Sequence, residues 1–589
     1  MKTTHHKKQI VRRPVADGCD RLFPRLHPVL ARVYAGRDIT ASESLDYSLA
    51  RLMPFDTLSG IDDATRLLAE AIRSDKRILI VGDFDADGAT SCAVAVLALR
   101  LMGAKAVEYL VPNRFEYGYG LTPEIVQVAL PRQPDVLVTV DNGVSSIAGV
   151  KMARDHGIQV IVTDHHLPGA VLPDADVLVN PNLPGDGFPS KCLAGVGVIF
   201  YVLLALRARL RETGWFEDSG LPEPNMAELL DLVALGTMAD VVPLDDNNRI
   251  LVAQGLARIR SGHCRPGMAA LLTLSKRDYR RIVAADLAFA VGPRLNAAGR
   301  LTDMSIGIEC LLADRQEQAL ELATRLDHLN RKRQSIESTM QTQALTLLDG
   351  MDLTQDSAEE KQLPFGLCLY DRTWHPGVVG IVASRIKDRV HRPVIAFADN
   401  EANTGDDEVR GSARSIAGLH VRDILDAVAT QNPGLIVRFG GHAMAAGLTI
   451  HHADLPAFRH AFDLEVRRRA SPETLQGILY TDGALDDDAL NLTLAEALRA
   501  GGPWGQAFPE PLFDGQFNLL SRRTVGARHL KLVLGVPSSG RRVDGIAFNM
   551  KDDDWPADAK RVHIAYRLDV NAFQGRRNVQ LIVEYMNFP

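Results

Sequence analysis

Short apolar runs alternate with amphipathic stretches of helix length between Arg77 and Pro181. The apolar runs predict strands, which are residues 78–81, 106–111, 136–140, 158–162 and 177–179. The stretches between them predict helices, which are residues 89–102, 124–130 and 145–156. A series of this kind predicts a parallel sheet with helices on both faces. Because open parallel sheets bind ligands at the carboxyl ends of their strands, the residues there are the first candidates for a functional site.

The rest of the chain changes pattern more than once, and 589 residues exceed what one hydrophobic core usually organises. A mainly helical region ends in a long charged helix, 316–348, which we expect to be a spacer. A second α/β unit and a β-rich region typical of a small barrel follow, so the predicted fold class is multidomain α/β. The expected segments are a mobile N-terminal arm with a leading segment (1–50), the parallel-sheet unit (51–240), a helical connector (241–350), the second α/β unit (362–455) and an OB-like β-barrel (473–589).

The overall composition narrows the class of protein. Apolar residues make up 46% of the chain and charged residues 24%, which is typical of a water-soluble globular protein. The formal net charge is −7, so a nucleic-acid partner would need a local basic surface. Six scattered cysteines without a CxxC pair favour reduced thiols and a cytoplasmic location. No apolar run approaches the length of a membrane span, so we expect no membrane partner.

The segment GDFDADG places Asp83, Asp85 and Asp87 between the first predicted strand and the helix that follows it. Three carboxylates so close in sequence repel one another unless cations neutralise them. They lie where an open sheet binds its ligands, which favours a metal site. The alternative is a surface loop in which one of the acids caps the helix.

Further side chains that bind metals end the neighbouring strands. Asp141 follows the third predicted strand, and Asp164, His165 and His166 follow the fourth. Asp240 ends a helical segment further along the chain. Carboxylate and imidazole ligands together suit Mn²⁺ or Mg²⁺. This convergence predicts a centre for two divalent metal ions of the kind that catalyses phosphoryl transfer.

Glycine-rich motifs elsewhere carry side chains suited to phosphate groups. These motifs are PNRFEYGYGLT, VGPRLNAAGR, GSARS and FGGHAMAAG. The candidate substrate-binding residues in them are Arg114, Arg294, Asn296, Arg300, Ser412, Arg414 and His442. The alternatives are a surface arginine for the first motif, a helix cap for the second, and helix packing of small residues for the last.

The β-rich C-terminal region gathers basic residues near His529 and Phe548. The basic residues are Arg522, Arg523, Arg528, Lys531, Arg541 and Arg542. An OB-fold could turn such a surface toward a single strand of nucleic acid. A solvated charged face is the alternative.

The DFDADG segment, the DNG at Asp141 and the run Asp164-His165-His166 resemble the signature motifs of the DHH phosphoesterase superfamily. The second α/β unit, with its GSARS and FGGHAMAAG motifs, is similar to the DHHA1 domain that accompanies DHH domains and binds substrate phosphates. The resemblance implies two bound divalent cations, Mn²⁺ or Mg²⁺, and places Asp83 and Asp164 behind the ligands, orienting them. It leaves open which histidine binds metal and which assists catalysis. The implied ligands and catalytic residues are Asp85, Asp87, Asp141, His165, His166 and Asp240.

Within that superfamily, the chain resembles the RecJ exonuclease family in three features: the PNRFEYGYG motif, the long helical connection and the β-rich tail. The resemblance implies degradation of single-stranded DNA from 5′ to 3′ to mononucleotides, in repair and recombination. It also implies a single-strand-binding protein and a helicase as partners besides single-stranded DNA. The alternatives are an oligoribonuclease or small-nucleotide phosphodiesterase, and a non-catalytic replication scaffold.

Overall fold

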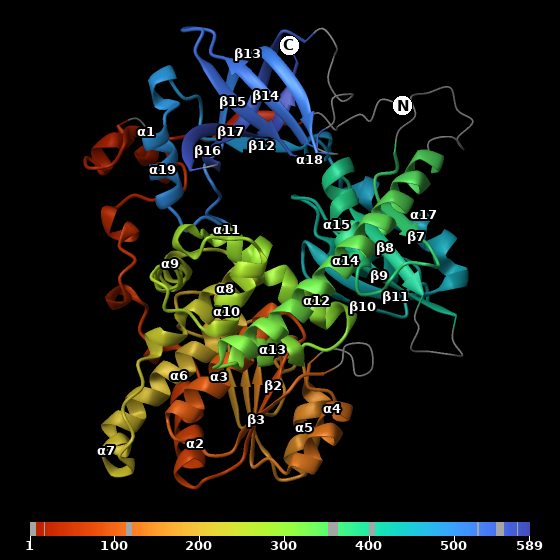
Figure 1. Cartoon of the computed structure of the whole chain (residues 1–589). Helices are drawn as coiled ribbons and strands as arrows, with labels where there is room; N and C mark the ends of the chain where they lie inside the picture. The colour runs from red at the N-terminus through yellow and green to blue at the C-terminus, as the bar shows by residue number, and fades with distance from the viewer. Residues whose placement is uncertain are drawn as a thin grey trace.

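The computed structural model describes residues 8–16, 18–112, 120–351, 363–399, 407–526, 529–548, 550, 559–573 and 575–588. In these residues the chain builds a parallel-sheet unit, a helical unit, a mixed-sheet unit and a closed barrel (Figure 1). The predicted fold class is therefore confirmed. Within the described ranges, no helix combines the length and apolarity needed to cross a membrane.

The first sheet is parallel throughout, in the order β3-β2-β4-β5-β6. Along β2, Ile78 and Ile80 face one hydrophobic core, while Leu79 and Val81 face another. This period of two explains why a fully apolar run forms a strand buried on both faces. Helices α2, α3 and α6 cover one face, and α4 and α5 cover the other. The strands are β2 (Ile78–Gly82), β3 (Val107–Leu110), β4 (Val136–Val140), β5 (Gln159–Thr163) and β6 (Val177–Val179), and the helices are α2 (Ile61–Arg73), α3 (Ala86–Leu101), α4 (Pro123–Ala129), α5 (Ile147–Asp155) and α6 (Gly195–Glu212).

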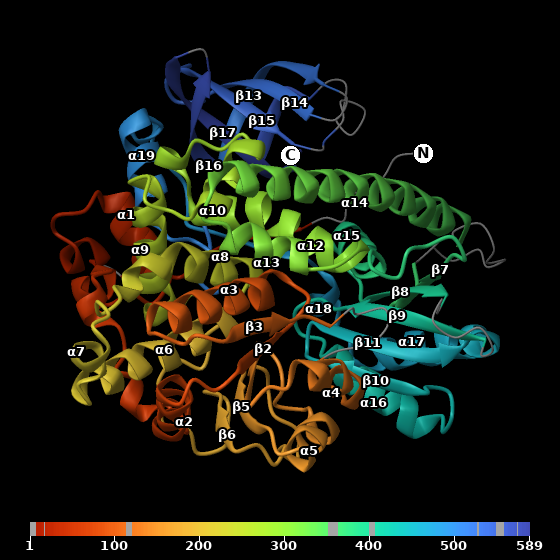
Figure 2. The same cartoon turned by 60° about the horizontal axis from the view of Figure 1, so that its bottom comes forward.

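The helical unit packs α8 against α3 and thereby joins the first sheet. The predicted spacer helix, α14, is longer than expected and packs along α10, α12 and α13 before it reaches α15 of the next unit (Figure 2). It therefore forms part of the core of both units as well as linking them. The elements are α8 (Leu230–Asp240), α9 (Asp246–Arg260), α10 (Pro266–Leu274), α11 (Ala284–Asp286), the π-helix η8 (Leu287–Val291), α12 (Gly292–Leu301), α13 (Ser305–Leu312) and α14 (Gln316–Met351).

The second sheet has the order β10-β11-β9-β8-β7 and is parallel only between β7 and β8. The GSARS motif lies at the end of β9, and the FGGHAMAAG motif forms the turn between β10 and β11. The alternative interpretation of this last motif as a packed helix is therefore wrong. Helix α17 shares the core of this sheet with α16. The elements are β7 (Leu367–Tyr370), α15 (Val379–Val390), β8 (Val394–Asp399), β9 (Glu408–Arg414), α16 (Val421–Gln431), β10 (Arg438–Gly441), β11 (Ala445–His451) and α17 (Leu455–Arg469).

The C-terminal strands close into a barrel in the order β13-β14-β15-β17-β16. Helix α19 (Leu492–Ala500) packs beside β16. The barrel strands are β13 (Phe513–Val525), β14 (His529–Gly535), β15 (Arg542–Ala547), β16 (Arg561–Phe573) and β17 (Arg576–Asn587).

The expected mobile N-terminal arm is wrong for its described part. Strand β1 (Gln9–Arg12) pairs in parallel with β12 (Ile478–Thr481), which precedes the barrel. The Arg12 guanidinium also donates hydrogen bonds of 3.0 and 2.9 Å to the two carboxylate oxygens of Asp514 in the barrel. Because these contacts join segments far apart in sequence, local polarity did not reveal them.

Candidate metal centre

The GDFDADG segment forms the tight turn from β2 into α3. Asp85 is the N-cap of α3, and one of its carboxylate oxygens accepts hydrogen bonds from the backbone N–H groups of Asp87 (2.9 Å) and Gly88 (3.0 Å). This cap explains why α3 begins at Ala86, earlier than expected. A Cβ atom at Gly88 would lie 2.5 Å from the carbonyl oxygen of Asp83, so the turn requires glycine there.

Asp87, in the first turn of α3, is buried against the start of α6. Its two carboxylate oxygens accept hydrogen bonds from the backbone N–H groups of Gly195 (2.7 Å) and Val196 (2.9 Å). Burial, with the neighbouring carboxylates of Asp240 and Asp85, raises the pKa of Asp87 well above its usual value. The N-terminus of α6 therefore orients the Asp87 carboxylate. The acids around Asp87 favour the binding of a positive charge beside it.

Asp141 follows β4 with a left-handed backbone, φ 62°, which is unfavourable for a residue other than glycine. The side-chain amide of the next residue, Asn142, donates to the carbonyls of Val81 (3.1 Å) and Val140 (2.9 Å), so it ties together the ends of β2 and β4. Asp141 is buried. Its pKa is raised well above the usual value, first by burial and then by Asp87 and the other nearby acids.

Asp164 organises the two histidines that follow it. One of its carboxylate oxygens accepts from the backbone N–H of His165 (2.7 Å) and lies 2.8 Å from Nδ1 of His166. Burial alone would lower the pKa of His166, but the hydrogen bond to Asp164 and the nearby acids outweigh it and raise this pKa to about 9. Asp164 therefore fixes the orientation of the His166 ring, and its role in orienting metal ligands stays a prediction.

His165 has a different environment. Its Nε2 atom lies 3.1 Å from a carboxylate oxygen of Asp141, 3.6 Å from one of Asp240 and 4.0 Å from one of Asp87. Burial lowers the pKa of His165, which favours the neutral imidazole that metals bind. His165 thus faces the acids directly, while His166 is turned toward Asp164.

The candidate ligands form three overlapping groups, within each of which the donor atoms lie within 4.8 Å of one another. The groups are Asp83 with Asp85 and Asp141, Asp87 with His165 and Asp240, and Asp141 with His165 and His166. Carboxylate oxygens dominate these groups and imidazole nitrogen is the minority donor, a set suited to Mn²⁺ or Mg²⁺. Burial, together with the neighbouring acids, raises the pKa values of Asp87, Asp141 and Asp240, so cations bound there would stabilise their charged forms. The donor set therefore fits two divalent cations.

Two features of this centre were missed in the sequence. Asp83 was expected to lie behind the ligands, yet the structure groups its carboxylate with those of Asp85 and Asp141. The amides of Asn180 and Asn182 donate to the backbone carbonyls of His166 (2.9 Å) and His165 (2.6 Å). A signal for these asparagines was present, because they directly follow the last predicted strand at the same edge of the sheet.

The second α/β unit faces this centre. The ring of His442, in the turn between β10 and β11, stacks beside that of His166 with centroids 6.4 Å apart and an angle of 14° between the planes. On the neighbouring strand, Arg414 donates to the hydroxyl of Ser412 (3.1 Å), and burial lowers the pKa of Arg414. A Cβ atom at Gly380 would lie 2.8 Å from that hydroxyl, so this glycine lets α15 approach closely. Of the three predicted residues of this unit, Ser412 and Arg414 thus lie on β9, and His442 lies in the turn that leads into the neighbouring strand β11.

The VGPRLNAAGR residues have separate roles in the structure. The Asn296 side-chain oxygen accepts from the backbone N–H of Ala86 (2.8 Å), and Arg300 donates to the carbonyl of Gly377 (3.2 Å). Arg294 instead pairs with Asp327 of α14 at 2.9 Å and donates to the Ala290 carbonyl, with its side chain only 14% exposed. These contacts engage the Arg294 guanidinium and fix α12 to α14, while its role in binding phosphate stays a prediction.

Two other predicted regions are incompletely described. Arg114 and Arg528 lie outside the described residues. In the barrel, Arg541 donates to the backbone carbonyls of Asp487 (3.0 Å) and Leu490 (2.9 Å), so it joins the barrel to the segment before α19. Lys531 pairs with Asp544 at 3.2 Å. These two contacts reduce the basic surface expected there.

Substitution of Gly299 by alanine should lower the activity of this centre by about 10²-fold, because displacements of about 1 Å have effects of this size. A Cβ atom at Gly299, in α12, would lie 1.8 Å from the carbonyl oxygen of Phe84, between Asp83 and Asp85. The added methyl group must push the metal-binding turn away from α12. The matched control is Gly350→Ala in α14, where a Cβ atom would meet nothing within 4 Å. Equal metal-dependent hydrolysis by the two variants would contradict this account.

Comparisons with known proteins agree with this architecture. Residues 77–237 match the model of the DHH family N-terminal domain, residues 364–468 that of the DHHA1 domain, and residues 481–585 that of the RecJ OB domain. The single-stranded-DNA-specific exonuclease RecJ of Dickeya dadantii is 54% identical over 579 residues, which cover 98% of this chain and 99% of that protein. The RecJ of Escherichia coli is 52% identical over 577 residues, with 98% of each chain covered.

Solved structures of RecJ are also similar to this chain. The crystal structure of RecJ from Thermus thermophilus in complex with Mn²⁺ is similar with a TM-score of 0.80 and 31% identity, covering 99% of this chain and 79% of that one. The Mg²⁺ complex of the same protein gives a TM-score of 0.74 and 30% identity, covering 99% and 78%. The metals expected from the donor set are those present in these relatives.

Proposed function

Since the chain belongs to the RecJ family of single-stranded-DNA-specific exonucleases, we propose that its metal centre hydrolyses single-stranded DNA from the 5′ end and releases mononucleotides. The observation that carries this proposal is the set of three donor groups at the carboxyl edge of the parallel sheet, in which Asp141 and His165 each belong to two groups. When bound, divalent cations supply activation of the attacking water and neutralise charge on the phosphate.

We assign the ligands from these groups. Asp83, Asp85 and Asp141 would hold one cation. Asp87, His165 and Asp240, again with Asp141, would hold the other. His165 is assigned as a ligand because its Nε2 atom faces the carboxylates.

His166 has another role in this proposal. Its Nδ1 is held by Asp164, and its ring faces His442 across the gap between the two α/β units. A protonated His166 ring would bind a phosphate oxygen of the strand and hold a proton close to the leaving 3′ oxygen. The positions of Ser412 and Arg414 support binding of the 5′-terminal phosphate in the same gap.

Substitution of Arg414 by alanine should raise KM for a 5′-phosphorylated strand by roughly tenfold to a hundredfold, because a hydrogen bond to a charged group is lost. The effect should be smaller on a strand with a 5′ hydroxyl. Arg467→Ala, which removes an exposed arginine on α17 of the same unit, is the matched control. The assignment fails if Arg414→Ala acts equally on both kinds of 5′ end.

The substrate class can be tested by comparing hydrolysis of long single strands, dinucleotides and cyclic dinucleotides. Preference for long single-stranded DNA supports an exonuclease, in which the barrel contributes to binding. Preference for dinucleotides would instead support a small-nucleotide phosphodiesterase.

An enzyme confined to single strands also needs a source of them, so we extend the proposal to a helicase and a single-strand-binding protein as partners. We also propose that the protein acts in the cytoplasm.

A further inference from the structure

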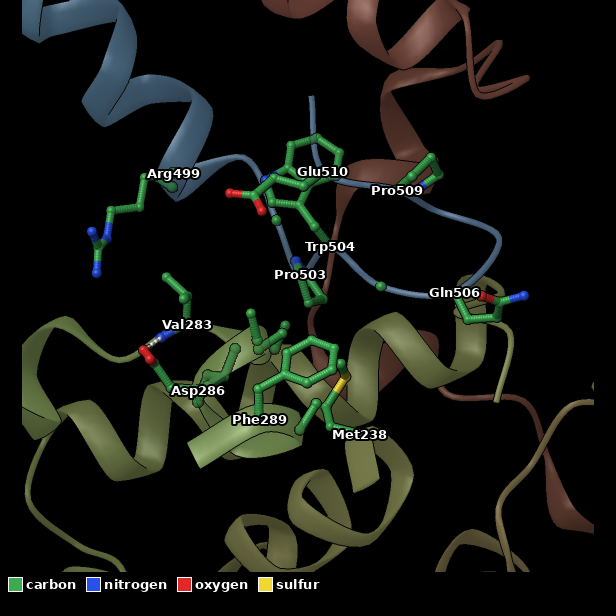
Figure 3. Close-up of a pocket in the computed structure, with 18 of the residues that line it drawn as sticks. Met238, Val283, Asp286, Phe289, Arg499, Pro503, Trp504, Gln506, Pro509 and Glu510 are labelled. Carbon is green, nitrogen blue, oxygen red and sulfur yellow. Dashed lines mark hydrogen bonds between the residues drawn. The ribbon is translucent and has the colours of Figure 1, made fainter. Parts of the chain in front are cut away.

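A pocket of about 750 Å³ lies between the helical unit and the segment that leads into the barrel (Figure 3). Its lower wall contains Phe289 of the π-helix η8 and Val241, which directly follows α8. Its upper wall contains Pro503 and Trp504, and Figure 3 shows the ring of Phe289 pointing toward them. The volume is within the range of roughly 300–1,000 Å³ that is typical of ligand sites.

The apolar side chains of this pocket are unusually exposed. Phe289 is 77% exposed, Val241 53% and Phe548, from the barrel side, 48%. Phe289 and Val241 also lie on irregular backbone: the first is in a π-helix, and the second has a left-handed conformation with φ 63° that disfavours branched side chains. Exposed apolar groups from separate elements that converge on one hollow mark a binding surface.

The opposite wall is rigid. The Trp504 indole N–H donates to the carbonyl of Leu498 (2.9 Å), and its ring stacks on Phe508 with centroids 5.0 Å apart and an angle of 16°. Tyr34 stacks on the same tryptophan, with centroids 5.8 Å apart. The Arg37 guanidinium also lies over the Trp504 ring, 5.3 Å from its centroid, so this tryptophan forms a fixed edge of the pocket.

Two residues that line the pocket are close in sequence to a residue of the metal centre. Met238 and Val241 line it on either side of the ligand Asp240. The junction of η8 and α12 packs on the same segment, since a Cβ atom at Gly292 would lie 3.1 Å from that of Ala239. The pocket therefore lies beside the segment that carries Asp240, with the barrel-side residue Phe548 also in its lining.

We propose that this pocket binds a nucleobase of the single strand, stacked on Phe289, at a position between the barrel and the metal centre. This inference rests on the proposed function. A base offers a flat apolar ring for Phe289. The lining holds four arginines and three acids, which are largely paired with one another: Arg277 with Asp286 at 3.1 Å, Arg499 with Asp569 at 3.5 Å and Arg567 with Glu510 at 2.6 Å. Stacking on Phe289, rather than phosphate binding, therefore carries the recognition. The arginines are Arg260, Arg277, Arg499 and Arg567, and the acids are Asp286, Glu510 and Asp569.

The test uses strands that carry one fluorescent 2-aminopurine at successive positions, bound to the full chain with Asp141→Asn to prevent cleavage. At one position the fluorescence should be strongly quenched by stacking. Adding Phe289→Ala should remove this quenching and raise Kd for the strand by at least about fivefold, the lower limit for loss of one stacked base. Adding Phe289→Trp should preserve both the quenching and the Kd for the strand. Leu320→Ala, which removes a side chain that is 47% exposed on α14, is the matched control.

The outcomes separate this inference from the proposed function. If Asp141→Asn alone cleaves strands normally, the proposed function fails. If that variant is inactive while Phe289→Ala binds and quenches like the control, only the base site is overturned. The base site is also overturned if Phe289→Ala changes only the sedimentation mass of the protein, which would mean that a second copy covers the pocket.

Discussion

Replacing Asp141 by asparagine should reduce nuclease activity by at least about 10³-fold, because loss of cation binding removes several kcal/mol of transition-state stabilisation. The metal-free protein should nevertheless become more stable. Asp141 is buried among other acids that raise its pKa, so removing its charge relieves repulsion in the folded state. We therefore expect the free energy of unfolding of the metal-free variant to exceed that of the metal-free parent protein.

Activity on single strands and thermal unfolding with a chelator and with Mn²⁺ check this prediction. Mn²⁺ at 100 times its Kd should stabilise the parent protein by about 2.7 kcal/mol and the variant much less. Asp155→Asn, at an exposed acid on α5 of the same unit, is the control and should resemble the parent. A folded Asp141→Asn protein that retains activity would contradict the assignment.

Replacing Arg37 by alanine should destabilise the protein by about 3–5 kcal/mol, because it leaves the buried Asp482 carboxylate with only the longer pair to Arg13, at 3.7 Å. The Arg37 guanidinium donates to both oxygens of Asp482 at 2.8 and 3.1 Å, and both side chains are at most 2% exposed. It also donates to the carbonyl oxygens of Val33 and Pro509. Arg37 therefore joins the N-terminal segment to the strands that lead into the barrel.

Urea unfolding of three variants tests this ion pair. The double variant Arg37→Met with Asp482→Asn should recover part of the lost stability, since the buried carboxylate charge is removed together with its main partner, while Arg13 keeps partial access to water. Arg66→Ala, which breaks the exposed pair with Asp63, should change stability by less than about 1 kcal/mol. A loss of only that size in Arg37→Ala would show that the buried pair contributes little.

The sequence predicted the parallel sheet and most of the metal centre because both depend on local patterns. Apolar runs such as β4 are buried on both faces, and the acids that end the strands must meet at one edge. The role of Asp83 was harder to predict. Asp83 and Asp85 are neighbours in one turn, and only the fold of that turn shows that both carboxylates reach Asp141.

Other features depend on contacts that no local pattern contains. The pairing of β1 with β12 and the Arg37–Asp482 pair join distant segments. Arg294 is of a residue type that binds phosphate and lies in a motif with small residues, but its guanidinium pairs with Asp327 of α14. The FGGHAMAAG stretch has neither helical nor strand periodicity, so the position of His442 beside His166 appeared only in the structure.

The most direct test of the central claim is product release from a long single strand labelled at either its 5′ or its 3′ end, with Mn²⁺, Mg²⁺ or a chelator. Labelled mononucleotide should appear at once from the 5′-labelled strand only, should require metal and should be absent with Asp141→Asn. Immediate release from the 3′-labelled strand, or release that persists in chelator, would contradict a metal-dependent 5′ exonuclease.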